Sequence, residues 1–374
     1  MGRQRRGAVR AHQKAASAER VALEERFFHI LEEDSEFVAL ITAHGARAEP
    51  LHRWFRYRQG FAPEFVRRFL AEARLPSGPV LDPFSGSGTV AIECARQGRN
   101  AVAVDVISAL AFLTQSRMLR DVPAWEGLDV SRDHALLMRE ALHAGHRAAV
   151  LCAAARTVDG EGRRHDASAP DVGSLLNLIR EDTAMPLSGR ALVLCADARS
   201  LPLADDSIAG VLTSPPYLSR YDYTRINERI QRLYADTGKG RQRRSQLRAS
   251  KHISASAQHG GLHPVVEEIS REAFERSGPA RARQLSSYFA DLGRVMDELA
   301  RVLKSGAPVW FNIAGTDHQR VYVPSDLVAA ALAEERGFKV ENIVVARELR
   351  DSGRNLGALR GVTPRESVLQ LRKR

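Results

Sequence analysis

Short apolar runs alternate with longer segments of helical periodicity along most of the chain. The runs are rich in Val, Leu and Ala, which is typical of strands that are buried on both faces of a parallel sheet. They lie at 79–84, 100–106, 191–198, 207–214, 308–315, 338–348 and 366–372. The segments between them predict helices at 88–98, 107–119, 286–303 and 324–336. This alternation predicts an α/β fold, with a mostly parallel sheet and helices on both faces.

Other segments depart from the alternation and divide the chain. Residues 1–20 hold six basic residues and a single Glu, which predicts a disordered arm, and residues 18–48 predict helix. Residues 128–186 predict a helical insertion, and residues 237–266 contain basic residues without any Asp or Glu. The predicted division is a basic arm and helical segment (1–50), an α/β domain (51–127, 187–236 and 286–374), a helical insertion (128–186) and a basic insertion (237–285).

Composition narrows the class of partner. Lys and Arg outnumber Asp and Glu by 55 to 45 and the pI is about 9.9, so a polyanionic partner is expected. The cysteines Cys94, Cys152 and Cys195 have no close spacing, which argues against a metal site or a disulfide framework. The sequence shows no signal peptide and no uncharged apolar stretch of membrane-spanning length, so we expect a cytoplasmic protein without a membrane partner.

The turn after the first strand has the composition of a ligand-binding loop. In "VLDPFSGSGTVAIEC" (80–94), Asp82 ends the strand, and Gly86 and Gly88 precede a helix. Glycines let backbone N–H groups approach a ligand, and parallel sheets bind ligands beyond the carboxyl ends of their strands. Asp105 ends the next strand, where a carboxylate can accept hydrogen bonds from ribose hydroxyls. The same spacing also occurs in purely structural glycine turns.

The neighbouring residues discriminate among nucleotide-like ligands. A nicotinamide cofactor is disfavoured because Ala91 stands where G-x-G-x-x-G needs its third glycine. A phosphate-binding loop is disfavoured because no Gly-Lys-Ser/Thr follows. An acid beside the glycines would repel pyrophosphate, but it suits a ligand that carries sulfonium and ammonium groups. The loop therefore favours S-adenosylmethionine.

A second motif, "GVLTSPPYLSRYDYTR" (210–225), ends a predicted strand in two prolines. Proline has no N–H and pushes the preceding residue out of helical geometry. Pro215 and Pro216 therefore predict a stiff, extended corner, with Ser214 and Tyr217 on either side. A proline pair can also simply end a strand.

The two motifs together carry a resemblance. "DPFSGSGT" followed downstream by "TSPPY" resembles the DNA amino-methyltransferases, which methylate an exocyclic amine of cytosine or adenine. "YRQGFAPEFVRRFL" (57–70) resembles the family segment that closes over the methionine end of the cofactor, and "SPPYLSRYDYTR" is similar to a group of bacterial DNA modification methylases. The similar segments are 50–106, 190–232 and 286–374. The resemblance implies a Rossmann-like class I S-adenosylmethionine-dependent methyltransferase fold, with a catalytic α/β domain and a target-recognition element in the basic insertion.

The resemblance also implies a set of cofactor-binding residues. They are Asp82, Phe84, Gly86, Gly88, Thr89, Asp105, Asp197, Ala198, Phe61 and Pro63. Among them, Asp105 would hold the ribose and Asp197 would accept from the adenine amine. The others would surround the methionine and adenine ends.

At the proline corner the implied chemistry is positioning of a poor nucleophile. Ser214 and the Pro215 carbonyl would each accept a hydrogen bond from the NH₂ group of the target base, which points the nitrogen lone pair at the methyl donor. Pro216 stiffens the corner, and Tyr217 would stack on a base extruded from the duplex. Ser in the first position favours cytosine N4 over adenine N6, because adenine enzymes usually carry Asp or Asn there.

DNA is the implied partner, and a cognate restriction endonuclease is a further candidate. Nucleic-acid contacts are expected from Tyr221, Arg225, Lys239, Arg241, Arg243 and Arg244. Three alternatives stay open: an RNA base-amine methyltransferase, an inactive nucleic-acid-binding module of the same fold, and a methyltransferase for a small molecule or protein.

Overall fold

The structure is a computed structural model. It describes residues 18–43, 48–55, 57, 59–156, 171–218, 223–235, 263–317, 321–349 and 364–374.

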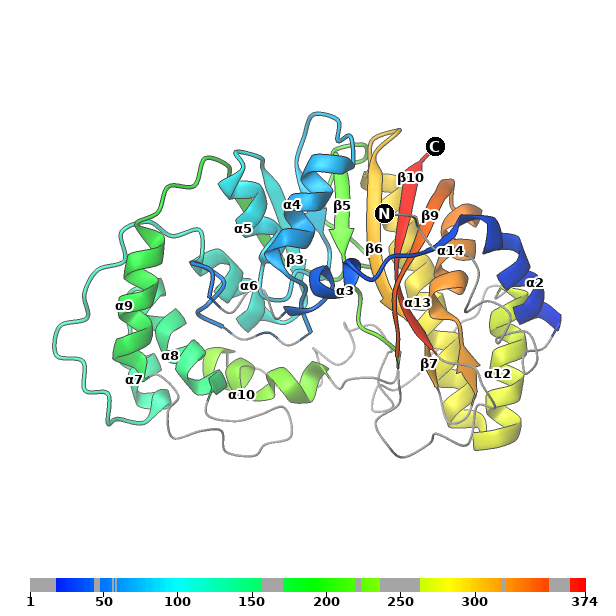
Figure 1. The fold of residues 1–374 in the computed structure, drawn as a ribbon. Coiled ribbons are helices and arrows are strands. Elements are labelled where there is room, and N and C mark those ends of the chain that lie inside the picture. Colours follow the sequence, from blue (N-terminus) through cyan, green and yellow to red (C-terminus); the bar gives the residue numbers. More distant parts are fainter. Residues whose placement is uncertain are drawn as a thin grey trace.

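An eight-stranded sheet forms the centre of the molecule (Figure 1). Its strands are β1 (Leu31–Glu33), β2 (Val80–Asp82), β3 (Ala101–Asp105), β4 (Ala191–Cys195), β5 (Gly210–Thr213), β6 (Pro308–Ala314), β9 (Phe338–Glu348) and β10 (Arg365–Lys373). The strand order is β1-β9-β10-β6-β5-β2-β3-β4, and all neighbours are parallel except β10, which is antiparallel to both β6 and β9. Two further short strands, β7 (Thr316–Asp317) and β8 (Tyr322–Val323), pair with each other. The predicted Rossmann-like class I fold is confirmed.

Helices cover both faces of the sheet, as the alternating pattern predicts. They are α2 (Ala18–Phe27), α3 (Phe37–Leu40), α4 (Pro63–Glu72), α5 (Thr89–Arg96), α6 (Ser108–Ser116), α7 (His134–Glu140), α8 (Ala144–Arg156), α9 (Val172–Thr183), α10 (Tyr223–Ala235), α12 (Pro264–Ser277), α13 (Pro279–Val302) and α14 (Ser325–Glu335), with a 3₁₀ turn η1 (Phe28–Ile30). None of these helices combines the length and apolar character that crossing a bilayer requires, within the part of the chain that is described.

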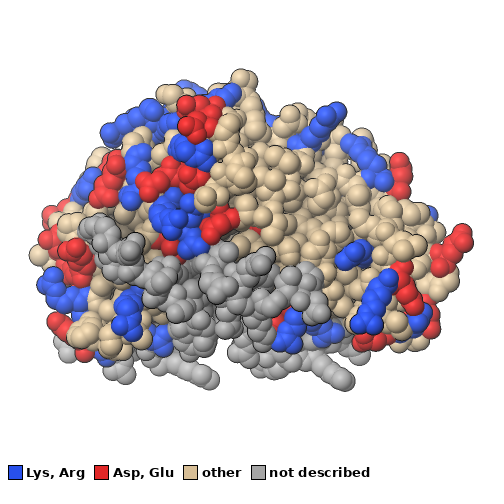
Figure 2. Space-filling model, turned by 180° about the vertical axis from the view of Figure 1, so that it is seen from behind, with Lys and Arg blue, Asp and Glu red and all other residues tan. Residues whose placement is uncertain are grey.

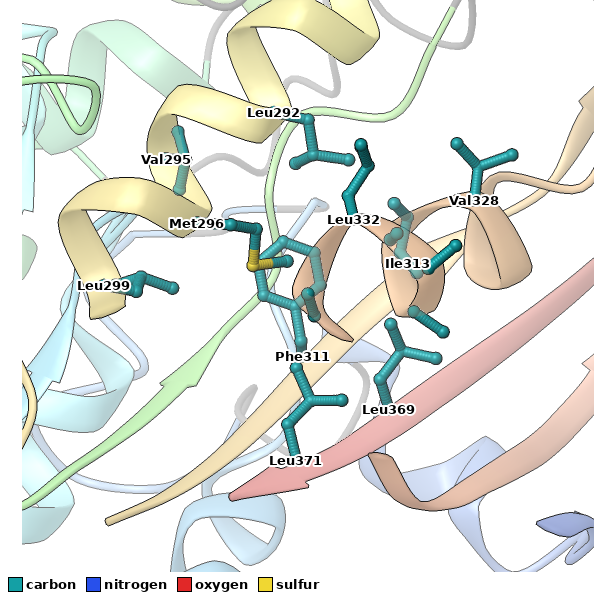
Figure 3. Packing of buried hydrophobic residues seen from close by; sticks show 14 of the residues in the cluster. Leu292, Val295, Met296, Leu299, Phe311, Ile313, Val328, Leu332, Leu369 and Leu371 are labelled. Carbon is teal, nitrogen blue, oxygen red and sulfur yellow. The ribbon is translucent and has the colours of Figure 1, made fainter. Parts of the chain in front are cut away.

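Alternate residues of each strand enter two separate cores. In β2, Val80 packs with α4 and α5 on one face, whereas Leu81 packs with α13 and α14 on the other. Figure 3 shows the second core, where Leu292, Val295, Met296 and Leu299 of α13 meet Phe311 and Ile313 of β6 and Leu369 and Leu371 of β10. Both faces of the central strands β2, β5 and β6 are buried, which explains why these strands appear in the sequence as continuous apolar runs.

The helical insertion forms a third core beside the sheet. Helices α7, α8 and α9 pack with α6 and α10 and bury Trp54 of the segment before the glycine turn (Figure 1). The predicted helical character of 128–186 is confirmed in its described residues.

Two predicted boundaries need correction. Residues 18–48 are not all helical, because β1 pairs in parallel with β9 and extends the sheet. Residues 264–285, which the sequence assigns to the basic insertion, instead form α12 and the start of α13. Val265, Ile269 and Leu285 are fully or almost fully buried in the same core as α13 and α14.

Candidate active site

A cleft opens at the carboxyl ends of β2, β3, β4 and β5. The strand order reverses at β2, and open parallel sheets bind ligands at such a switch point. The empty volume is about 810 Å³ if the part open to solvent is included, which is enough for a nucleoside-sized ligand. The lining residues are Tyr57, Gln59, Gly60, Phe61, Asp82, Pro83, Phe84, Ser85, Ser87, Thr89, Asp105, Val106, Ile107, Ala196, Asp197, Ala198, Ser214 and Pro216.

The glycine turn forms one wall of this cleft. Gly86 and Gly88 have φ angles of +49° and +82°, which L side chains rarely adopt. A Cβ on Gly86 would lie 2.6 Å from the Tyr57 ring, so the close packing of Tyr57 over the turn requires glycine. The Gly86 N–H donates to Asp105 Oδ2 at 2.9 Å, which ties the turn to the end of β3. Neither glycine lines the cleft itself; their neighbours Ser85 and Ser87 do.

Two carboxyl groups of the cleft have perturbed proton affinities. Burial raises the pKa of Asp82 to about 7, although Thr213 and the Phe84 N–H both donate to its Oδ1 and oppose that rise. Burial also raises the pKa of Asp105 to about 6, against donors that include the Ile107 and Gly86 N–H groups. A cation in the cleft would favour the charged forms, so the pair suits a positively charged ligand.

The end of β4 supplies a third carboxylate. Asp197 is held from behind by Arg199, whose Nη2 lies 2.7 Å from Asp197 Oδ2. Arg199 is buried and also pairs with Asp291 on α13, at 2.9 Å. Ala198 lies next to Asp197 on the cleft wall. Neither Arg199 nor Asp291 is predicted from the sequence, and the only local signal is that Arg199 lies two residues after Asp197.

The predicted closing segment lies against the cleft. Tyr57, Gln59, Gly60 and Phe61 line it, and Phe61 is buried. Pro63 does not line the cleft: it is buried in the first turn of α4, where proline suits a position whose N–H has no helical partner. Tyr57 also lines this wall. It is not among the predicted cofactor-binding residues, although it lies in the quoted segment 57–70.

The proline corner brings Ser214 to the same cleft as Asp82 and Asp105. Ser214 and Pro216 line it, and Tyr288 of α13 donates to the Pro216 carbonyl at 3.0 Å, which fixes the corner from behind. Pro215 is not among the lining residues.

Tyr217 requires a correction. It is only 8% exposed and does not line the cleft, so the predicted stacking of its ring on a target base does not fit this structure. Its phenol contacts Ser214, Asn312 and Glu366 instead. The sequence could not reveal this, because Asn312 and Glu366 come from β6 and β10, about 100 and 150 residues further along.

The side chains predicted to contact nucleic acid lie outside the described part of the structure. Tyr221, Lys239, Arg241, Arg243 and Arg244 lie outside the described residues, and so does the side chain of Arg225 in α10. Among the described residues on the face in Figure 2, Lys and Arg side chains are interspersed with Asp and Glu and do not form one basic patch.

A separate cluster of His and Glu lies away from the cleft. The ligand atoms of Glu49, His52 and Glu93 lie within 4.8 Å of one another. However, Arg67 and Arg96 pair with both carboxylates, so the cluster is already neutralised by arginine.

Comparison with known proteins agrees with the motifs. Residues 36–112 match the family model described as DNA methylase. The chain is 23% identical to Type II methyltransferase M.BsoBI of Geobacillus stearothermophilus, over 96% of this chain and 92% of that protein. It is also 23% identical to Type II methyltransferase M.AvaI of a Nostoc species, over 87% of this chain and 86% of that protein. Among solved structures, a SAM-dependent methyltransferase of Methanosarcina mazei aligns with 82% of this chain and 96% of its own, at 10% identity and a TM-score of 0.35, which is too weak a likeness to bear on function.

The fold and the cleft define an S-adenosylmethionine-dependent methyltransferase. The match and the relatives confirm the resemblance to the DNA amino-methyltransferases, which methylate cytosine N4 or adenine N6. The chain is a DNA methyltransferase.

Proposed function

We propose that this enzyme methylates N4 of cytosine in DNA. The observation that carries the proposal is that Ser214 lines the same cleft as Asp82, Asp105 and Asp197. A single side-chain acceptor at the proline corner thus faces the space in which the cofactor would lie. Ser in that position, rather than Asp or Asn, supports cytosine over adenine.

The cleft residues fit the cofactor by their chemistry. Asp82 and Asp105 are carboxyl groups that gain from a cationic ligand, because burial penalises their charge in its absence. Asp105 would hold the ribose, Asp197 would accept from the adenine amine, and Tyr57 and Phe61 would cover the apolar surfaces. When bound, S-adenosylmethionine supplies the electrophilic methyl group.

The corner would prepare the amine for attack. Its lone pair is delocalised into the base ring, so the nitrogen is a poor nucleophile until its protons are held out of the ring plane. Ser214 Oγ, which lines the cleft, would accept one of those N–H groups. Tyr288, which donates to the neighbouring Pro216 carbonyl, keeps the corner rigid. This holding effect is entirely positional and needs no covalent intermediate.

The remaining partners follow from the class of relative. We propose that the target base leaves the duplex, and that Tyr221, Arg225, Lys239, Arg241, Arg243 and Arg244 contact the nucleic acid. Because M.BsoBI and M.AvaI are named Type II methyltransferases, we also propose that this enzyme belongs to a restriction-modification system with a cognate endonuclease.

Base-resolved sequencing tests the proposal. DNA from cells that express the gene should carry N4-methylcytosine at one sequence motif, and Ser214→Ala should remove it while purified protein still binds S-adenosylmethionine. N6-methyladenine instead would exclude the cytosine assignment. Methylation of RNA but not of DNA would exclude DNA as the substrate, and a fully active Ser214→Ala variant would exclude the proposed site.

A further inference from the structure

The hydroxyl of Ser214 belongs to a buried hydrogen-bond chain that no sequence motif marks. Ser214 Oγ lies 3.2 Å from the phenol oxygen of Tyr217, and that oxygen lies 2.8 Å from Glu366 Oε1. Asn312 Nδ2 reaches the same phenol oxygen at 2.8 Å. The other oxygen of Glu366 accepts from Arg347, its cross-strand neighbour on β9, at 2.8 Å from Nε and 2.6 Å from Nη2. This hydrogen-bond chain therefore connects the cleft wall to residues of β6, β10 and β9.

Glu366 and Asn312, which lie away from the cleft, fix the direction of the hydrogen bonds in this chain. A carboxylate can only accept, so Tyr217 gives its single proton to Glu366. The NH₂ of Asn312 can only donate, so it uses one lone pair of the phenol oxygen. The Ser214 hydroxyl donates to the same phenol oxygen, at 3.2 Å. The Ser214 proton consequently points away from the cleft, and its oxygen offers only lone pairs to a group in the cleft.

The burial of these groups makes that direction stable. Asn312 and Glu366 are 1% and 3% exposed, so water is largely excluded as a competing partner for them. Arg347 donates to the second oxygen of Glu366, so both oxygens of this carboxylate are engaged as acceptors. A serine hydroxyl without such neighbours rotates freely and can donate as readily as accept.

We propose that Glu366, Asn312 and Tyr217 are positioning residues that hold Ser214 as a hydrogen-bond acceptor for the target amine. The proposal rests on the proposed function and assigns Tyr217 a role through Ser214 in place of stacking. An exocyclic amine offers protons, so a serine proton turned into the cleft would oppose it. Holding the hydroxyl in the accepting orientation removes that arrangement before the base enters.

The variant Glu366→Gln tests the direction of the chain with almost no change of shape. Arg347 needs an acceptor, so the glutamine oxygen should face Arg347 and its NH₂ should face Tyr217. The phenol proton then turns to Ser214, and the Ser214 proton turns into the cleft. The single-turnover rate of methyl transfer should fall about tenfold or more, the equivalent of one hydrogen bond. The affinity for S-adenosylmethionine should stay the same.

Glu341→Gln is the matched control. Glu341 also pairs with an arginine across β9 and β10, at 2.8 Å from Arg372, but it lies on the exposed part of that strand pair. Its rate should equal that of the unmodified enzyme.

Tyr217→Phe is the second variant, because it removes the acceptor of the Ser214 proton. It should slow methyl transfer as Glu366→Gln does, and it decides the question if Glu366→Gln fails to bind cofactor.

Rescue separates positioning from simple structural support. In a Ser214→Asp background the corner carries a carboxylate, which has no proton to orient and can only accept. Glu366→Gln should therefore change the rate of methyl transfer by less than about threefold in this background. Loss of cofactor binding by both Glu366→Gln and Tyr217→Phe would mean a structural role and would overturn the proposal. So would wild-type rates for both Glu366→Gln and Tyr217→Phe when Ser214→Ala is inactive; that result would leave the proposed function standing. An active Ser214→Ala variant would instead refute the proposed function itself.

Discussion

Affinity for S-adenosylmethionine should depend on pH through Asp82. The perturbation is a change from pH 8 to pH 6. Because burial raises the pKa of this carboxyl to about 7 in the free enzyme, the group is mostly charged at pH 8 and mostly protonated at pH 6. A sulfonium and ammonium ligand binds the charged form, so affinity is full above the pKa of the free enzyme and falls below it. One pH unit below that pKa, about one Asp82 in eleven is charged, and the dissociation constant should rise about tenfold.

The variant Asp82→Asn isolates this carboxyl. Thr213 and the Phe84 N–H both donate to Oδ1, so an asparagine oxygen can keep both hydrogen bonds. The variant should bind S-adenosylmethionine weakly, and only the smaller pH dependence due to Asp105, whose pKa is raised to about 6, should remain. Its free energy of unfolding should exceed that of the unmodified protein at pH 8, because the folded state raises the Asp82 pKa from 3.8 to about 7 and so loses stability as pH rises through that interval. The gain is on the order of 4 kcal/mol as an upper limit and should vanish near pH 4.

Isothermal titration calorimetry between pH 6 and pH 8 measures the affinity, and denaturant unfolding measures the stability. S-adenosylhomocysteine, which lacks the sulfonium charge, is the control ligand and should show a weaker pH dependence. A dissociation constant for S-adenosylmethionine that stays constant over this range would refute the reasoning. So would an Asp82→Asn variant that binds as tightly as the unmodified protein.

Three further changes have expected outcomes. Gly86→Ala should weaken cofactor binding, because its Cβ would lie 2.6 Å from the Tyr57 ring; Gly127→Ala, also at positive φ but with nothing within 4 Å, controls for backbone strain in the same calorimetric titration. Asp291→Asn should loosen Arg199 behind Asp197 and raise KM for the cofactor with little change in kcat, whereas an unchanged KM would argue against a role for Asp197 in cofactor binding. Leu299→Ala, in the core of Figure 3, should lower the free energy of unfolding by about 2–5 kcal/mol, measured by denaturant titration, and a loss under 1 kcal/mol would contradict its full burial.

The sequence predicted those parts of the molecule that depend on local pattern. The apolar runs correctly predicted the strands β2 to β6 in chain order, because their continuous apolar pattern differs from the periodic pattern of the helices between them. Asp82 and Asp105 were predicted as site residues because each ends a strand. In a doubly wound sheet, the carboxyl ends of the parallel strands lie at one edge, where both residues line the cleft. These inferences needed no knowledge of long-range contacts.

The misses depend on contacts between distant residues. The three residues of β1 carry too little pattern to be recognised, and pairing with β9 alone makes them a strand. The burial of Tyr217 follows from Glu366 and Asn312, which reach it only after β10 inserts beside β6. Motif spacing placed Tyr217 near the site, but no local signal gives the direction in which a side chain points.

The position of β10 makes the proline corner depend on the assembly of the whole sheet. This strand lies between β6 and β9, although it follows both in the chain. On its two faces, Arg365 pairs with Glu24 of α2, whereas Glu366 contacts Tyr217. A shortened product that ends before residue 365 would keep the glycine turn but expose two bare strand edges and lack the carboxylate beside the corner. Under the proposed function, such a fragment would retain part of the cleft without a working proline corner, so cofactor binding alone is an unsafe measure of an intact enzyme.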